Sequence, residues 1–227
     1  MSYSALSIVL VSNSFLAYLY ISLGTEKWLL KKFGNGSGQS RHILFNRILG
    51  LLLFGFVPLL LFGFFSNLGF KELGLGNSLN TKTLLLTLGI IVLPVVVNFF
   101  AARTPDNLAM YPQIRTKKWD KALLMISALS WTMYLLGYEI MLRGVLFFSC
   151  LAEMNLVWAI AINTSIYALI HIPKGMKETL GSIPMGIVLC LITYYTGSIW
   201  SAFFIHCSLA LSNEWFSLKF SKEIVIK

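Results

Sequence analysis

The chain has 227 residues, of which 57% are hydrophobic and 12% are charged, and its mean hydropathy is +0.76. Soluble domains are nearer to about 45–50% apolar and about 25% charged, so this composition excludes a soluble protein and predicts a polytopic membrane protein. The formal charge of +9 does not indicate a nucleic-acid partner, because the basic residues stand between apolar runs and not on one face of a soluble domain.

Seven apolar segments are long enough to be membrane-spanning helices. A bilayer core about 30 Å thick needs roughly 20 apolar residues in a helix. In chain order the candidates cover about 4–23, 48–70, 83–102, 122–152, 156–172, 181–196 and 198–216. We therefore predict an all-α transmembrane bundle of seven to eight helices embedded in the lipid bilayer. Residues 34–40, GNGSGQS, have the composition of a flexible loop.

The first segment has no basic stretch before it and no clear cleavage site after it, so we expect a retained span with its N-terminus outside. With seven crossings, fifteen of the eighteen lysines and arginines then lie on one side, which the positive-inside rule makes cytoplasmic. The C-terminus lies on the same side. These fifteen are Lys27, Lys31, Lys32, Arg41, Arg47, Arg103, Arg115, Lys117, Lys118, Lys121, Lys174, Lys177, Lys219, Lys222 and Lys227.

The fourth segment, 122–152, is too long for one straight crossing at about 1.5 Å per residue. Gly137 could break it into two helices, giving eight in all. A second full crossing would place the later basic residues outside. We therefore expect one long tilted or kinked helix, or a helix pair of which only one member crosses.

Four ionisable residues stand out at membrane depth within the predicted spans: Glu139, Arg143, His171 and His206. Each costs about 2.5–3.5 kcal/mol on insertion scales, so such residues usually face a partner or a wet cavity. Glu139 and Arg143 are four apart and share a helix face, which by itself is equally consistent with an ion pair that helps a helix to insert. A carboxylate and two histidines from separate helices can together activate a water molecule and stabilise an oxyanion.

A metal ion is the weaker interpretation of the same residues. Zinc does accept one glutamate and two histidines, but no HExxH motif is present. We therefore expect no cofactor, with a divalent metal such as zinc as the alternative. Cys150, Cys190 and Cys207 all lie in apolar runs and are expected to pack as small hydrophobic residues.

Three ordered motifs resemble the CPBP family of intramembrane peptidases, which contains the type II CAAX prenyl endopeptidases and the bacterial Abi-type proteins. The family pattern EExxxRG, FxxxH and HxxxN is matched by YEIMLRG at 138–144, YALIH at 167–171 and HCSLA at 206–210. The resemblance covers about 120–216. It implies N-terminal transmembrane helices over 1–119, a core of catalytic type over 120–216, and a short cytoplasmic tail over 217–227.

The resemblance also implies an activity and a location. Members of the family cleave membrane-associated peptides or proteins from within the membrane. We therefore expect a substrate of this kind, and we expect the protein to be located in the bacterial cytoplasmic membrane. Carried over by motif, Glu139 and His171 activate water, or Glu139 orients its partners, and His206 stabilises the oxyanion. Arg143 holds Glu139 in place.

The motifs depart from the family at three positions. Tyr138 replaces the first glutamate, which the family uses as the base, and a phenol can only offer a hydrogen bond there. Tyr167 replaces the phenylalanine of the second motif. Ala210 replaces the asparagine of the third motif, and losing one oxyanion donor typically lowers a rate about 10²–10³-fold.

Three nearby polar residues are possible substitutes for the missing groups. Glu178 either folds back towards the site or pairs with the lysines beside it. Asn213 lies on the same helix face as His206 but about 10 Å further along the axis. Glu214 is expected to be a charge at the membrane interface.

Three functions remain open from the sequence. The first is an intramembrane endopeptidase. The second is a catalytically impaired relative that acts as a membrane scaffold or immunity-type binding protein, which the changes at Tyr138 and Ala210 favour. The third is a small transporter that uses the polar residues as its path.

Overall fold

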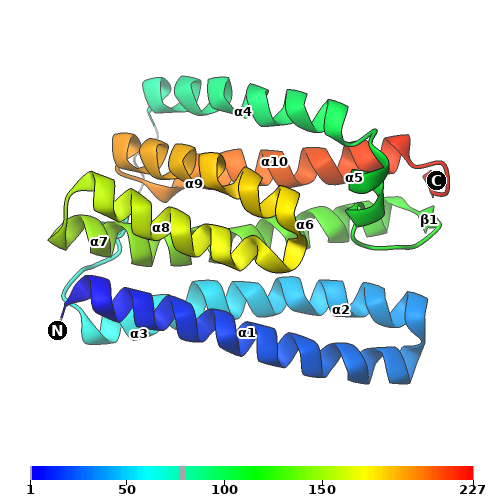
Figure 1. The fold of residues 1–227 in the computed structure, drawn as a ribbon, viewed down its shortest axis with the longest axis horizontal. Helices are drawn as coiled ribbons and strands as arrows, with labels where there is room; N and C mark the ends of the chain where they lie inside the picture. Colours follow the sequence, from blue (N-terminus) through cyan, green and yellow to red (C-terminus); the bar gives the residue numbers. More distant parts are fainter. Residues whose placement is uncertain (1, 77–79, 227) are drawn as a thin grey trace.

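The structure is a computed structural model that describes residues 2–76 and 80–226, and it is an antiparallel bundle of long helices (Figure 1). Among these described residues, six helical stretches are long and apolar enough to cross a membrane, and α10 is a further helix of 22 residues. The long stretches are α1 (Tyr3–Phe33), α2–η1–α3 (Asn35–Gly50, Leu51–Phe56, Val57–Phe65), α4 (Thr81–Ala101), α6–η2–α7 (Lys121–Glu139, Ile140–Phe147, Phe148–Glu153), α8–η3 (Leu156–His171, Ile172–Lys174), α9 (Met176–Thr196) and α10 (Ile199–Phe220). The short elements are α5 (Pro105–Met110), β1 (Lys118–Trp119) and β2 (Val225–Ile226).

Polar side chains fix where the helices begin. The side chains of Ser2, Asn80, Asp120, Asn155 and Ser198 each accept a hydrogen bond from a backbone amide in the first turn of α1, α4, α6, α8 and α10. Such caps satisfy amides that have no partner within the helix. The apolar runs between these caps therefore fold as separate helices with defined starts.

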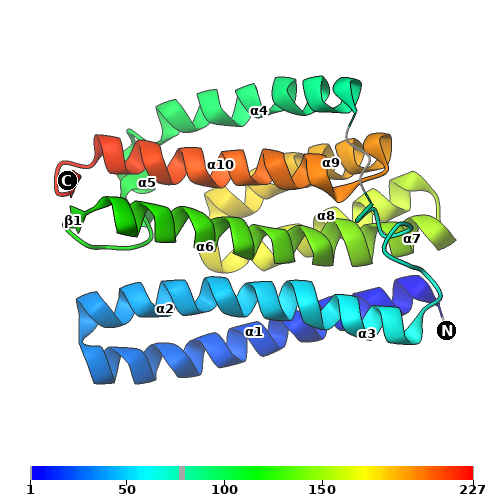
Figure 2. The same ribbon diagram turned by 180° about the vertical axis from the view of Figure 1, so that it is seen from behind.

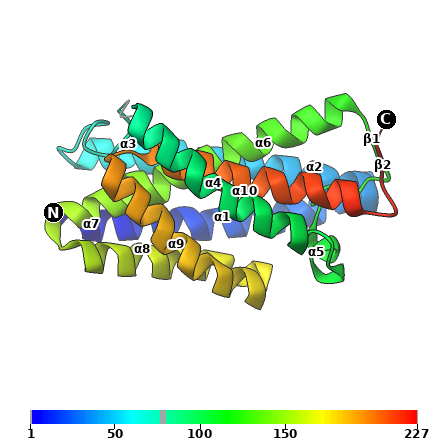
Figure 3. The ribbon, with the colours of Figure 1, turned by 90° about the horizontal axis from the view of Figure 1, so that it is seen from above.

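The helices form a layered bundle. The hairpin of α1 with α2–η1–α3 packs against α6 and η2, and α8 packs against α9 (Figure 2). Seen from above, α4 lies over α10, which also contacts α6 and α9 (Figure 3). At the end of the bundle near the C-terminus, β1 and β2 pair in parallel, with Lys118 opposite Val225. Helices α6, α8 and α10, which carry the three motifs, thus surround one interior region.

The fourth helix is one continuous stretch from Lys121 to Glu153, as the preferred prediction had it. The helix does not break at Gly137. This glycine lies where the backbone of the second stretch comes closest, and an added Cβ would be 2.9 Å from the Gly50 carbonyl oxygen and 2.9 Å from the Leu51 Cα. Small residues at such crossings let two membrane helices approach each other.

Substituting Gly137 with alanine is expected to separate these helices and to lower the free energy of unfolding by about 1–3 kcal/mol, the usual cost of overpacking. Thermal unfolding in mild detergent measures the effect. Gly63→Ala is the matched control, because nothing lies within 4 Å of a Cβ at that position. Equal melting temperatures for the two variants would show that the crossing tolerates a methyl group.

Some predictions about the ends of the elements were wrong. The segment 34–40 is not a loop: α2 begins at Asn35, and only Gly34, with φ of 75°, separates it from α1. Arg47 is not in a loop but inside α2, where it is 3% exposed. Helix α10 continues to Phe220, so the tail after the bundle is shorter than predicted. Lys227, which we assigned to that tail, lies outside the described residues.

The beginning of α1 is held by the end of α7. The carboxylate of Glu153 accepts hydrogen bonds from the Ser2 hydroxyl (2.5 Å), the Tyr3 amide (2.6 Å), and the amide (3.0 Å) and hydroxyl (2.6 Å) of Ser4. A carboxylate at a helix N-terminus also interacts favourably with the helix dipole. The two ends are therefore joined by four hydrogen bonds to one side chain.

Candidate active site

The first motif lies where the fourth helix changes its winding. Residues Ile140–Phe147 form the π-helical segment η2, which begins directly after Glu139 and contains Arg143. The amide of Asn163 in α8 donates to the Leu142 carbonyl oxygen at 2.6 Å, and its own oxygen accepts from the Cys190 thiol at 3.2 Å. Wide turns of this kind are frequent at functional sites because they redirect side chains. Asn163 thus fixes the irregular segment from a neighbouring helix.

Glu139 connects the first motif to the third. Its Oε1 accepts a hydrogen bond from Nδ1 of His206 at 2.6 Å and lies 3.4 Å from Nη1 of Arg143. Glu139 and Arg143 are both 0% exposed, and His206 is 6% exposed. Since a carboxylate oxygen accepts and the imidazole Nδ1–H donates, Nε2 of His206 is the nitrogen left for another partner. The arrangement is a histidine oriented by a buried carboxylate, with an arginine that balances the carboxylate charge.

His171 is oriented in a different way. Its Nδ1 lies 2.7 Å from the backbone carbonyl oxygen of Tyr167, one turn earlier in α8. A carbonyl can only accept, so Nδ1 carries the proton and Nε2 of the neutral ring is an acceptor. His171 is 7% exposed. Each of the two histidines therefore presents Nε2, and no hydrogen bond within the described residues occupies either of these atoms.

Two tyrosines join the histidines. The ring of Tyr138 is edge-on to His206 at 5.6 Å and to His171 at 6.2 Å, and the ring of Tyr167 is 4.5 Å from His171 and 6.0 Å from His206, all between centroids. The guanidinium of Arg143 lies 4.5 Å from the centroid of the Tyr167 ring, a cation–π contact. Together with Glu139, these five side chains form one cluster.

Several polar atoms of this cluster have no hydrogen-bond partner in the described part of the protein. They are the Tyr138 hydroxyl, Oε2 of Glu139, and Nε and Nη2 of Arg143, and all are buried. Buried polar groups are normally satisfied, so a concentration of unsatisfied ones needs an explanation such as bound water or a ligand. Here they lie next to the two imidazoles that have free Nε2 atoms.

The structure brings most of the predicted site residues together but not all of them. Glu178 lies outside the cluster, where it accepts from the Tyr111 hydroxyl at 3.0 Å and is 3.9 Å from Lys174. Burial and the adjacent Glu178 carboxylate raise the pKa of Tyr111 well above its ordinary value, which keeps this phenol protonated as the donor. The side-chain oxygen of Asn213 is buried with no partner, and no contact links it to His206.

Ala210 lies one turn after His206 in an apolar cluster. Its neighbours there include Trp131, Leu135 and Phe203. Within the described residues, the hydrogen bond of the His206 side chain is to Glu139 and not to a side-chain amide.

A second buried ion pair was not predicted. Glu214 was expected at the membrane interface, but it is 1% exposed and lies 3.5 Å from Arg47. Nη1 of Arg47 donates to the hydroxyls of Ser127 and Ser130, both at 3.0 Å, and the Ser127 hydroxyl donates to Glu214 at 2.9 Å. One feature of the sequence could have indicated a buried polar contact here. Two serines stand three residues apart in α6, which places their hydroxyls on one helix face. The ion pair ties α2, α6 and α10 together at the end of the bundle towards the C-terminus.

The donor set does not fit a metal ion. Among residues 2–76 and 80–226, no group of three or more His, Cys, Asp and Glu side chains lies close enough to hold one. Glu139 uses its Oε1 on His206 and Arg143, and His171 contacts neither of these groups through a hydrogen bond.

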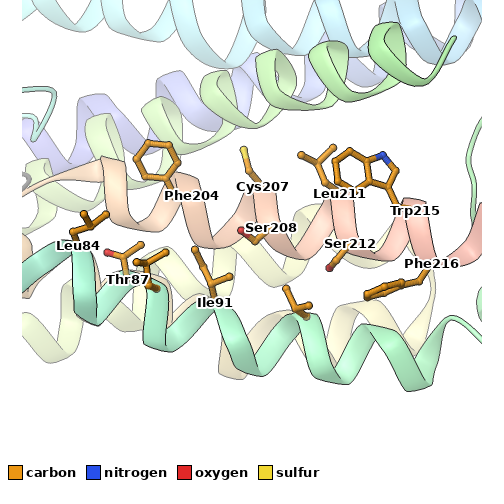
Figure 4. A pocket seen from close by; sticks show the side chains of 12 residues that line it. Leu84, Thr87, Ile91, Phe204, Cys207, Ser208, Leu211, Ser212, Trp215 and Phe216 are labelled. Carbon is orange, nitrogen blue, oxygen red and sulfur yellow. The ribbon is translucent and has the colours of Figure 1, made fainter. Parts of the chain in front are cut away.

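An apolar groove of about 550 Å³ lies beside the site, between α4 and α10 (Figure 4). Its lining contains no ionisable group other than Cys207, which follows His206 in the chain. The hydroxyls of Thr87 and Ser212 are already bonded to backbone carbonyl oxygens. The groove is thus an apolar surface of the bundle and separate from the polar cluster.

A comparison with protein-family models supports the motif assignment. Residues 120–212 match the model of the Rce1-like type II CAAX prenyl endopeptidases. This range contains all three motifs and agrees with the resemblance drawn from them. Neither the curated proteins nor the solved structures gave a match.

Proposed function

We propose that the protein is a membrane-embedded peptidase that cleaves a membrane-associated peptide or protein, because residues 120–212 match the model of the Rce1-like type II CAAX prenyl endopeptidases. The observation that carries the proposal is the 2.6 Å contact between Glu139 Oε1 and His206 Nδ1. A buried carboxylate on Nδ1 makes the opposite nitrogen of an imidazole a better general base. The reaction is hydrolysis of a peptide bond.

In the proposed reaction a water molecule binds between the Nε2 atoms of His206 and His171. Its oxygen attacks the carbonyl carbon of the substrate while one proton passes to Nε2 of His206. The resulting imidazolium is stabilised by Glu139, and Arg143 keeps that carboxylate ionised. The C–N bond then breaks, and the proton passes from the imidazolium to the leaving nitrogen, so that the products are a carboxylic acid and an amine.

This assignment changes the roles predicted from the motifs. Glu139 acts as a positioning residue for His206, because its carboxylate is fully buried and touches His206 instead of His171. The Tyr138 hydroxyl has no other partner and is the donor for the developing oxyanion. It thereby takes over part of the role that the missing asparagine has in the family.

A second function is favoured by a specific observation. The position of the family's base is occupied by Tyr138, whose ring lies against both histidines, and Ala210 offers no oxyanion donor. Without a carboxylate that water can reach, the same cluster could serve only to shape a binding surface for a membrane peptide. The protein would then be a scaffold that binds and does not cut.

Tyr138→Phe tests the proposed reaction with little risk to folding, because the hydroxyl that it removes has no hydrogen bond to lose. We expect the rate of cleavage of a quenched peptide library by the purified protein to fall about 10²–10³-fold, as for the loss of one oxyanion donor. His171→Gln and His206→Gln are expected to abolish cleavage.

Thermal melts of all three variants, beside the exposed Lys222→Gln as a control, establish that they are folded. Cleavage by wild-type protein that is unaffected by all three substitutions would refute the site. Stable co-purification of a partner, with no cleavage by wild-type protein, would instead support the scaffold.

A further inference from the structure

A polar pocket of about 370 Å³ lies between the α1–α2 hairpin, the segment around α5, α6 and the end of α8. Three cations line it: Arg47 from α2, Arg115 from the loop after α5, and Lys174 from the end of η3. No aspartate or glutamate is among its described lining residues. Its positive lining distinguishes it from the apolar groove between α4 and α10.

The pocket is connected to the histidine cluster by two routes. Tyr134 lines the pocket, and its ring is 5.8 Å from the ring of Tyr138, one turn further along α6. Lys174 follows His171 by three residues in the chain, at the end of the same helical stretch. A group bound in the pocket would therefore lie beside the site and not at a remote surface.

Two of the three cations of the pocket, Arg115 and Lys174, retain capacity for an anion. The charge of Arg47 is already paired with the carboxylate of Glu214 at 3.5 Å, so this residue is not counted among them. The side chain of Lys174 is 33% exposed. Its Nζ lies 3.9 Å from Oε2 of Glu178, at the long end of the range for an ion pair. Arg115 is exposed and donates to the backbone carbonyls of Leu108 and Ala109, so its charge is not neutralised by a carboxylate.

We propose that this pocket binds a carboxylate of the peptide that enters the histidine site, with Arg115 and Lys174 as the residues that contact it. The inference rests on the proposed function and specifies its substrate as a peptide with an anionic group near the bond to be cut. Carboxylates are the anions that unmodified peptides carry, and guanidinium and ammonium groups bind them through charge-assisted hydrogen bonds. The carboxylate comes either from the C-terminus or from an acidic side chain.

The test measures binding separately from cleavage. The full chain, in nanodiscs of uncharged phosphatidylcholine, is titrated against three pools of N-palmitoylated, fluorescein-labelled octapeptides, and anisotropy is read. One pool has a free C-terminus and no acidic residue, one is amidated with a single glutamate, and one is amidated with none. We expect a carboxylate-bearing pool to bind about tenfold more tightly than the neutral pool, the size of a charge-assisted hydrogen bond. The tighter of the two identifies the source of the carboxylate.

Arg115→Gln and Lys174→Gln are each expected to reduce this preference. Arg103→Gln and Lys222→Gln remove equivalent charges that do not line the pocket and should leave the preference unchanged.

Equal binding of all three pools by the wild type would overturn the proposal, as would a preference that survives in the Arg115→Gln/Lys174→Gln double variant. A pocket that binds labelled phosphatidylglycerol through these residues and shows no peptide preference would be a lipid site and would also refute it. A carboxylate preference without any cleavage would refute the proposed hydrolysis alone.

Discussion

Glu139→Ala is expected to lower the free energy of unfolding by about 3–5 kcal/mol and to abolish cleavage. The substitution leaves Arg143, which is 0% exposed, without its carboxylate, and an unpaired charge in the interior is strongly destabilising. It also removes the acceptor of the His206 Nδ1–H. Reversible unfolding in mixed micelles measures the stability, and the quenched peptide library measures the activity.

The double variant Glu139→Leu/Arg143→Met separates these two effects. Replacing both charges by apolar groups removes the unpaired arginine, and such replacements are often neutral or even stabilising. We expect the double variant to recover most of the stability lost in Glu139→Ala but none of the activity, because His206 still lacks its carboxylate. A single variant as stable as wild type would contradict a buried ion pair at this position.

Glu214→Ala is the second change with a large expected effect, again about 3–5 kcal/mol of stability. It leaves Arg47 buried at 3% exposure, with two serine hydroxyls and a glutamine but no anion. The histidine cluster is not in contact with this pair, so its own hydrogen bonds should remain.

Glu223→Ala provides the matched control for this variant, because Glu223 is exposed and, among the described residues, its carboxylate forms no ion pair. The melting temperature of Glu223→Ala should equal that of the wild type. If Glu214→Ala melts at that same temperature, then Glu214 lies at the interface, as the sequence had suggested.

The long apolar runs made most of the fold predictable, because a helix that crosses a bilayer has a minimum length and few charges. The ends of the helices were less predictable where charges flank an apolar run. Arg47 precedes such a run and has the pattern of a loop residue, yet α2 begins at Asn35 and carries Arg47 into the interior. Its acceptor Glu214 is 167 residues away in the chain, and the two serines of α6 indicate only a polar helix face, not which charges lie on it.

The candidate site was predictable in its members but not in its contacts. The three motifs place a carboxylate and two histidines on separate helices, and the structure brings these helices together. The motifs do not specify which histidine Glu139 reaches. In the structure Tyr138 and Glu139 both lie at the end of α6, and both contact His206 of α10, a helix that packs against α6.

The hydrogen bonds between the start of α1 and Glu153 have a consequence for biosynthesis. Ser4 and Glu153 are 149 residues apart, so the ribosome completes α1 long before it makes the carboxylate that holds its N-terminus. The first helix must therefore stay in the membrane with that end unattached until the fourth long stretch has been inserted. The contact between α1 and α7 is therefore made late, whereas the partners of α1 in α2 and α3 follow it directly in the chain.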